Sequence, residues 1–177
     1  MVTRILAVLS VCGFAASLAV YLFSYGGLTL DRMGLWPFAF TFGIVLLYVP
    51  MCLIEYSSLN QTTFRKRFSE GKPFWIVPAM NCLGAFFVIH FVLFGALSHF
   101  ATPDVLNGRY VLNDHGAIRK VLTQREYISL KGDELRIFPT GWMVFYFVTA
   151  AYWWFPQRRS GGALEANRLA PVKSGFR

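Results

Sequence analysis

Cysteine, histidine and carboxylate side chains are the groups in this chain that could do chemistry. The three cysteines, Cys12, Cys52 and Cys82, lie in three separate apolar segments. Thiolates bind soft metals, so three of them brought together could form a metal site. Cysteines enclosed by apolar residues more often serve as small hydrophobic side chains. We therefore expect inert thiols, with no metal and no cofactor.

His90 lies in the middle of an apolar segment, where an ionisable side chain suggests a functional role. Successive residues of a helix are rotated by about 100°, so His90 faces away from both Asn81 and His99. These residues therefore cannot supply two ligands on one helical face, which excludes a haem held by two histidines of this segment. The simplest expectation is a neutral His90 that is hydrogen-bonded to another helix. The polar candidates within the apolar segments are His90, Asn81 and Glu55.

No pair of groups is placed for acid–base or nucleophilic catalysis. Asp133 and Glu134 are adjacent, and adjacent residues of a helix point in different directions. The sequence contains no glycine-rich phosphate loop, no zincin motif and no nucleophile elbow. We therefore expect a protein that is not an enzyme.

The composition indicates a membrane protein. Of the 177 residues, 55% are hydrophobic and 15% are charged, whereas about a quarter of the residues of soluble domains are charged. A membrane-spanning helix needs about 20 apolar residues. Four segments approach or reach this length, at residues 5–25, 35–54, 74–97 and 138–155. We predict an all-α membrane protein whose four spans form a transmembrane helical bundle.

The first apolar segment has two features with alternative interpretations. It follows Arg4, as in a cleavable signal peptide, but its apolarity continues for a full span, which favours a retained helix. Gly13 and Ser17 are small residues four positions apart, a spacing that allows helices to approach closely in lipid. We expect them to pack within this chain; the alternative is a dimer of two chains.

Basic residues predict the orientation, because Lys and Arg concentrate in cytoplasmic connections. They occur at Arg4, in the connection between the second and third segments, and in the tail, residues 158–177, which we expect to be flexible. Both termini are then cytoplasmic in a bacterial inner membrane, and residues 98–137 form an extracytoplasmic insert. The net charge of +8 comes mostly from these basic cytoplasmic segments, which would also attract anionic lipid headgroups. We expect membrane lipids, and no nucleic acid, as partners.

The insert contains a turn and a helix-capping signal. Residues 113–116 read NDHG, types that favour turns, and they separate two short β-prone runs, so a β-hairpin is predicted. Thr123 and Glu126 have the spacing of a capping box, which predicts a short helix through about Lys131. An isolated hairpin is marginal in water, so it must pack on this helix, on the first connection (residues 26–34), on a partner chain or on the headgroups. The candidate contact residues are Arg109, Tyr110, Asp114, His115, Arg119 and Lys120 in the insert, and Arg65, Lys66 and Arg67 in the basic connection.

The length, the four predicted spans and the long loop before the last span resemble the bacterial quinone-coupled thiol oxidases that recharge periplasmic disulfide donors. Such enzymes need two cysteine pairs in their outer loops, because their chemistry is thiolate exchange. The insert of this chain contains no cysteine. The resemblance therefore concerns architecture alone and implies no activity here.

These features favour a non-catalytic interaction module: a small multi-pass subunit, sensor or immunity-type factor with a protein partner or a second copy of itself. The alternative is an oligomeric channel or small transporter, with His90, Asn81 and Glu55 as pathway groups. A membrane enzyme is the third possibility. We expect the insert to supply contact residues rather than catalytic ones; the alternative is a lid that only covers the outer end of the helices.

Overall fold

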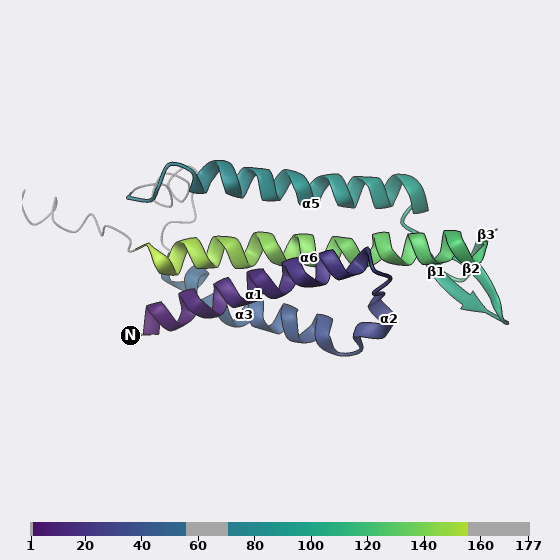
Figure 1. Ribbon diagram of the computed structural model, residues 1–177, viewed down its shortest axis with the longest axis horizontal. Helices are drawn as coiled ribbons and strands as arrows, with labels where there is room; N and C mark the ends of the chain where they lie inside the picture. Colours follow the sequence, from purple (N-terminus) through teal and green to yellow (C-terminus); the bar gives the residue numbers. More distant parts are fainter. Residues whose placement is uncertain (1, 56–70, 156–177) are drawn as a thin grey trace, which may run out of the picture.

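The computed structural model describes residues 2–55 and 71–155 of the chain. It is mostly helical, with a small antiparallel sheet (Figure 1). Three helices are long and apolar enough to cross a membrane: α1 (Val2–Ser24), α3 (Trp36–Glu55) and α5 (Ile76–Ser98). They fall within a few residues of the first three predicted spans.

The helix α6 (Gln124–Trp154) differs from the prediction. A short helix ending near Lys131, separate from a last span, was expected, but 31 residues form one continuous helix. Gly132 and Pro139 lie inside it, although glycine costs about 1 kcal/mol and proline about 3 kcal/mol in a helix interior. Both residues are buried, and α6 contacts all three of the other long helices. This packing outweighs the local propensities that favoured a break.

The four long helices lie side by side, with α6 in the middle (Figure 1). The helix α5 runs along one side of α6, and α1 and α3 run along the other. Long helices that follow one another in the sequence run in opposite directions. As a result, α1 begins and α6 ends at the same end of the molecule. The short helix α2 (Leu30–Met33) and the sheet lie at the opposite end.

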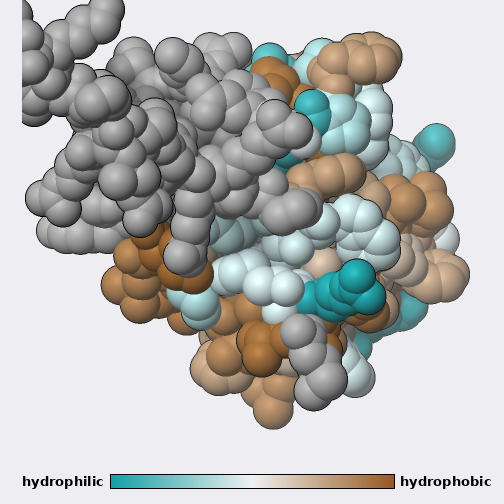
Figure 2. Space-filling model, turned by 90° about the vertical axis from the view of Figure 1, so that its left-hand side faces the viewer, coloured by the Kyte–Doolittle hydropathy of each residue, from teal (hydrophilic) through white to brown (hydrophobic). Residues whose placement is uncertain are grey.

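The burial pattern is the reverse of that in a soluble helical bundle. The buried side chains concentrate on α6, which is the least apolar of the long helices and includes buried Trp142, Tyr146 and Tyr152. The three apolar helices around it instead expose large hydrophobic side chains such as Leu22, Phe38 and Val92. Figure 2 views the end at which α1 begins, and hydrophobic residues form much of the outer edge of its described surface. Such an exterior suits hydrocarbon rather than water.

Small residues allow α1 to lie close to α6. Ala7, Ser10, Ser17 and Ser24 are its buried residues. The three serine hydroxyls donate hydrogen bonds to backbone carbonyls of the same helix; for example, Ser17 Oγ donates to the carbonyl of Gly13 at 2.8 Å. A Cβ atom on Gly13 would overlap the ring of Tyr146 in α6. The small-residue face of α1 therefore packs within the chain, as expected.

Tyr146 lies between α6, α1 and α3 and is only 4% exposed. Its ring lies against Gly13 of α1, and its hydroxyl lies against Gly43 of α3. The hydroxyl donates a 2.8 Å hydrogen bond to the carbonyl of Phe40. A bulky side chain of α6 thus fits into the space that two glycines of the neighbouring helices leave open.

The sheet has three strands, β1 (Thr102–Leu106), β2 (Arg109–Asp114) and β3 (Ala117–Val121), in the order β1-β2-β3. The strands predicted around residues 113–116 are β2 and β3, which pair antiparallel. The expected hairpin is extended by β1, which was not predicted. Asn107 and Gly108 connect β1 to β2 with φ values of 51° and 74°, the left-handed conformation that Asn-Gly adopts in tight hairpins.

The sheet packs on the first turns of α6. Ala101, Leu112 and Leu122 form a small core against which Tyr110, Tyr127 and Leu130 pack. The predicted capping box is present: the Thr123 hydroxyl accepts the Glu126 backbone N–H at 3.2 Å, and the Glu126 carboxylate accepts the Thr123 N–H at 2.8 Å. The start of α6 and the sheet are thereby held as one unit.

The capping box predicts an acid-sensitive start of α6. An ion pair with Lys120, together with the N–H and hydroxyl of Thr123, lowers the pKa of Glu126 from 4.5 to about 2. Because the pKa is lower in the folded chain, this stabilisation is complete above pH 4.5 and is lost as the pH falls towards 2. Thr123→Ala should weaken the first turn of α6 by about 1 kcal/mol and should raise the pKa of Glu126 towards its ordinary value. Carbon-13 titration of the Glu126 carboxyl checks the shift; an unchanged pKa in the variant would contradict it.

Candidate functional site

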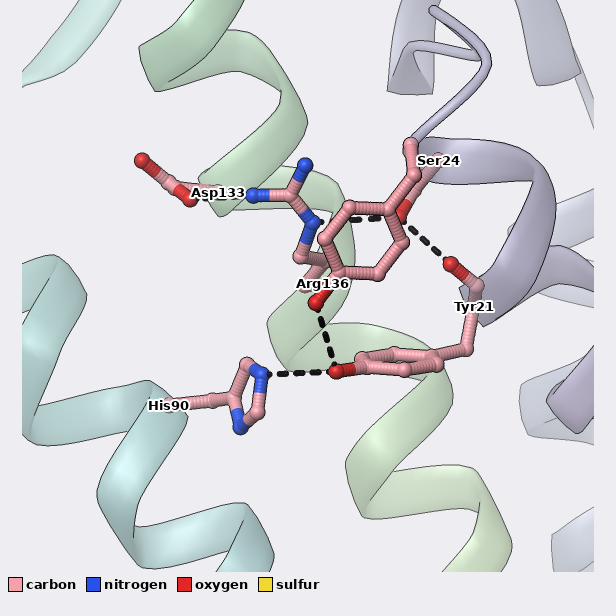
Figure 3. A network of polar contacts seen from close by, with 6 residues as sticks. Tyr21, Ser24, His90, Asp133 and Arg136 are labelled. Atoms are coloured by element: carbon pink, nitrogen blue, oxygen red, sulfur yellow. Dashed lines mark hydrogen bonds and ion pairs between the residues drawn. The ribbon is translucent and has the colours of Figure 1, made fainter.

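A network of polar side chains links α1, α5 and α6 near the sheet end of the bundle (Figure 3). Its centre is the Tyr21 hydroxyl, which lies 3.1 Å from His90 Nε2 and 2.8 Å from the hydroxyl of Tyr25. His90 Nδ1 lies 2.9 Å from the carbonyl of Phe86, one turn earlier in α5. A carbonyl only accepts, so Nδ1 carries the proton, and in the neutral ring Nε2 accepts from Tyr21. His90 is thus hydrogen-bonded to another helix, as expected from its position.

Arg136 carries the network onto α6. Its Nε donates to Ser24 Oγ at 3.2 Å, and its guanidinium lies over the ring of Tyr25, 4.1 Å from the centroid. It also forms an ion pair with Asp133 one turn earlier. The Ser24 hydroxyl donates to the carbonyl of Tyr21 at 2.6 Å. One arginine therefore holds the end of α1 against α6, while Tyr21 holds α1 to α5.

A second charged group lies about one turn earlier in α6, beside α2. Lys131 Nζ lies 3.2 Å from Glu134 Oε2 and 3.5 Å from Asp31 Oδ2. Burial lowers the pKa of Lys131, but Glu134 and Asp31 outweigh it, so the net shift is upward. Burial also raises the pKa of Glu134, an effect that Lys131 offsets only in part. These three residues tie the α1–α3 connection to α6.

The side chains of this network make contacts between helices. Within residues 2–55 and 71–155, no three His, Cys, Asp or Glu side chains gather as a metal site would require. The cysteines are free: Cys12 and Cys82 are exposed and Cys52 is half-buried. Tyr21, His90 and Arg136 are each committed to hydrogen bonds within the chain. The arrangement is best described as a clamp between helices.

The candidate contact residues of the insert are partly paired with one another. Asp114 accepts a 2.7 Å hydrogen bond from Arg119 across the β2–β3 turn, and Lys120 pairs with Glu126 at 2.7 Å. Tyr110 stacks on Tyr127 of α6 with ring centroids 4.6 Å apart. Arg109 is exposed, and His115, whose side chain is 99% exposed at the turn, has its Nε2 atom 3.9 Å from Asp114 Oδ1.

The other candidates are not brought together. Asn81 lies on an exposed face of α5, away from the half-buried His90. Glu55 is the last residue of α3. Arg65, Lys66 and Arg67, and the tail at 158–177, lie outside the described residues.

Sequence reasoning missed the partners of His90. Tyr21 and Tyr25 are four residues apart, and Asp133 and Arg136 are three apart, spacings that place each pair on one helical face. These local pairs could have been found from the sequence. Which pair faces His90 depends on how three helices rotate against one another, which no local pattern specifies.

No family model, no curated protein and no solved structure matches this chain. Its function is therefore inferred from its own residues and geometry.

Proposed function

We propose that this chain is a four-span integral protein of a bacterial inner membrane that binds a protein partner through its extracytoplasmic sheet. In this proposal α6 is the fourth span, both termini are cytoplasmic, and the protein is a non-catalytic subunit, sensor or immunity-type factor. The observation that carries the proposal is the exposure of β3, all five residues of which are exposed to solvent.

The membrane placement is supported by the charges of α6. Residues 137–154 contain no Asp, Glu, Lys or Arg, whereas the first part of α6 contains Arg125, Lys131, Asp133 and Arg136. The uncharged part lies beside the three apolar helices, and 18 residues at 1.5 Å each span about 27 Å, close to the thickness of the hydrocarbon. The charged part, with the sheet, then stands in water or among headgroups.

The strand β3 is suited to bind an extended segment. It forms one edge of the sheet, and edge strands present unpaired backbone groups to which a partner strand can add. Ile118 and Val121 are 57% and 60% exposed there, which is unusual for β-branched residues outside a membrane. At the other edge, Pro103 of β1 cannot donate a backbone hydrogen bond. We therefore expect docking at β3.

A channel or small transporter is less well supported. The middle of the bundle is filled by α6 side chains such as Trp142 and Tyr146, and a conducting path needs polar groups that face one another. Of the polar candidates, Asn81 is exposed, His90 is bonded to Tyr21, and Glu55 is the last residue of α3. Conduction would therefore require an assembly of several copies.

Site-specific photo-crosslinking in cells tests the docking proposal. A photoreactive phenylalanine analogue is placed at Ile118 of β3 and, as the matched control, at Ile128 of α6, which is 48% exposed. We expect an adduct of one defined mass from position 118 and none from position 128. Replacing Val121 by lysine should abolish that adduct, because edge lysines oppose strand addition. No adduct at position 118, or equal adducts at both positions, would refute the docking role of β3.

A further inference from the structure

An apolar cleft opens between α1, α5 and α6 near the end at which α1 begins. Its volume is about 420 Å³, within the range of about 300–1,000 Å³ that is common for ligand pockets. Aromatic rings make up most of its wall, and two small residues, Ala150 and Ala151, lie among them. The residues concerned are Phe14 of α1, Trp75 before α5, and Phe147, Ala150, Trp154 and Phe155 at the end of α6.

A second hollow of about 340 Å³ adjoins this cleft, and a positively charged side chain forms part of its wall. It is lined by Arg4, Ala7 and Val8 of α1 and by Trp153 and Trp154 of α6. Trp154 lines both hollows, and Val8 and Val11, one turn apart on α1, line one each. The two hollows therefore follow each other along the same pair of helices.

Arg4 is available to a ligand. It is exposed, and it forms no ion pair with any residue in the described part of the chain. Trp154 is 59% exposed, whereas the indole N–H of the neighbouring Trp153 donates to the carbonyl of Leu47 at 3.4 Å. A guanidinium and an indole N–H beside an apolar cleft form a mixed site, suited to a molecule with an anionic head and an apolar tail.

The distance from Arg4 to the cleft indicates which kind of apolar chain the site can hold. Arg4 and Phe14 are ten residues apart on one helix, which corresponds to about 15 Å at 1.5 Å per residue. That is about half of the roughly 30 Å hydrocarbon layer. With Arg4 at headgroup level, the cleft thus reaches the middle of the bilayer, which is the depth of an acyl chain in one leaflet.

From this geometry we infer that the α1–α5–α6 cleft binds one anionic phospholipid. One acyl chain lies between the aromatic rings of the cleft, and the phosphate is bound by Arg4. A zwitterionic lipid has the same tail but carries a cation near Arg4, so it binds less tightly. The inference depends on the membrane placement of the helices and not on the docking role of β3.

Native mass spectrometry of the full chain tests the headgroup part. The protein is released from micelles that contain equal amounts of phosphatidylglycerol and phosphatidylcholine with identical chains. We expect one retained lipid, with about a fivefold preference for phosphatidylglycerol, the effect of one basic residue near an anionic surface. Arg4→Gln should abolish this preference. Arg125→Gln, which removes an exposed arginine at the other end of the molecule, should leave it unchanged. An equal preference in wild type and Arg4→Gln would overturn the site.

Tryptophan quenching tests the part of the inference that concerns the acyl chain, and its main comparison uses the wild-type protein. Phosphatidylglycerol with a dibrominated acyl chain should quench the fluorescence of the wild type more than the matched phosphatidylcholine, because Trp75 and Trp154 line the cleft. The difference should vanish in Arg4→Gln. Ala150→Phe, which fills the cleft, should reduce quenching by both lipids. Equal quenching by both lipids in the wild type would overturn the inference. A wild-type dimer that Ala150→Phe converts to monomers would also overturn it, because the cleft would then be an interface between two copies of the chain.

Discussion

Gly43→Ala should destabilise the helical bundle by about 1–3 kcal/mol, the usual cost of overpacking, although alanine favours a helix more than glycine does. A Cβ atom at Gly43 would overlap the hydroxyl of Tyr146, and the next ring atom is 3.6 Å away, an ordinary contact. Tyr146→Phe alone should cost about 1 kcal/mol, because it removes the hydrogen bond to the Phe40 carbonyl. In the double variant the overlap disappears, so alanine at position 43 should be tolerated.

A double-mutant cycle of unfolding free energies in mixed micelles measures this coupling. Gly13→Ala is the contrasting variant: its Cβ atom would meet the ring carbons of Tyr146, so Tyr146→Phe should not rescue it. Gly84→Ala is the matched control, because no atom lies within 4 Å of a Cβ atom there, and it should not destabilise the chain. Additive effects of Gly43→Ala and Tyr146→Phe would show that Tyr146 does not fit between the helices as described.

Lys131→Met should destabilise the chain at neutral pH by about 2–3 kcal/mol, because removing one partner of a buried ion pair leaves the other charge uncompensated. Lys131 is 8% exposed, and the side chain of Glu134, its nearest carboxylate partner, is 13% exposed. The double variant Lys131→Met/Glu134→Gln should recover much of the loss, since it leaves no unpaired charge. Thermal unfolding of the three proteins at pH 7 provides the comparison.

The loss in Lys131→Met should also depend on pH. Burial raises the pKa of Glu134 even when Lys131 is present, and without Lys131 the folded-state pKa rises further. A carboxyl whose pKa is higher in the folded chain destabilises it at pH values above that pKa, and the penalty disappears below the unfolded-state value. The gap between wild type and variant should therefore narrow as the pH falls from 7 to 4. A gap that is constant with pH would mean that Glu134 is not the group left unpaired.

The periodic and compositional features of the chain were predictable. Three apolar helices follow from run length alone, and Thr123 with Glu126 gave the start of α6 correctly, because capping is a local interaction. The strand β1 was missed, since Pro103 and Asp104 are unfavourable in strands. The Asn107-Gly108 pair that precedes β2 was the available signal for it.

The features that were not predictable depend on tertiary packing. A helix break near Lys131 is a reasonable local prediction, but Gly132 lies against neighbours that only the tertiary structure supplies. A Cβ atom there would lie 3.2 Å from the Arg136 guanidinium and 3.8 Å from the Ser24 carbonyl of α1. The Tyr21–His90 bond joins residues 69 positions apart, and the position of Tyr146 between two glycines depends on the rotation of α1, α3 and α6. A single sequence contains no local signal for such rotations.

Cysteine accessibility tests the central claim, that a four-span bundle displays the sheet outside the cell membrane. In a background without Cys12, Cys52 and Cys82, Asp114→Cys places a thiol beside the β2–β3 turn and Ser69→Cys places one in the basic connection. Intact cells are treated with a membrane-impermeant maleimide. We predict labelling of the cysteine at position 114 in intact cells, and of the one at position 69 only after permeabilisation. Labelling of position 69 but not of position 114 in intact cells would reverse the orientation. Labelling of both positions in intact cells would mean that α5 does not separate them across the membrane, and it would contradict the four-span arrangement.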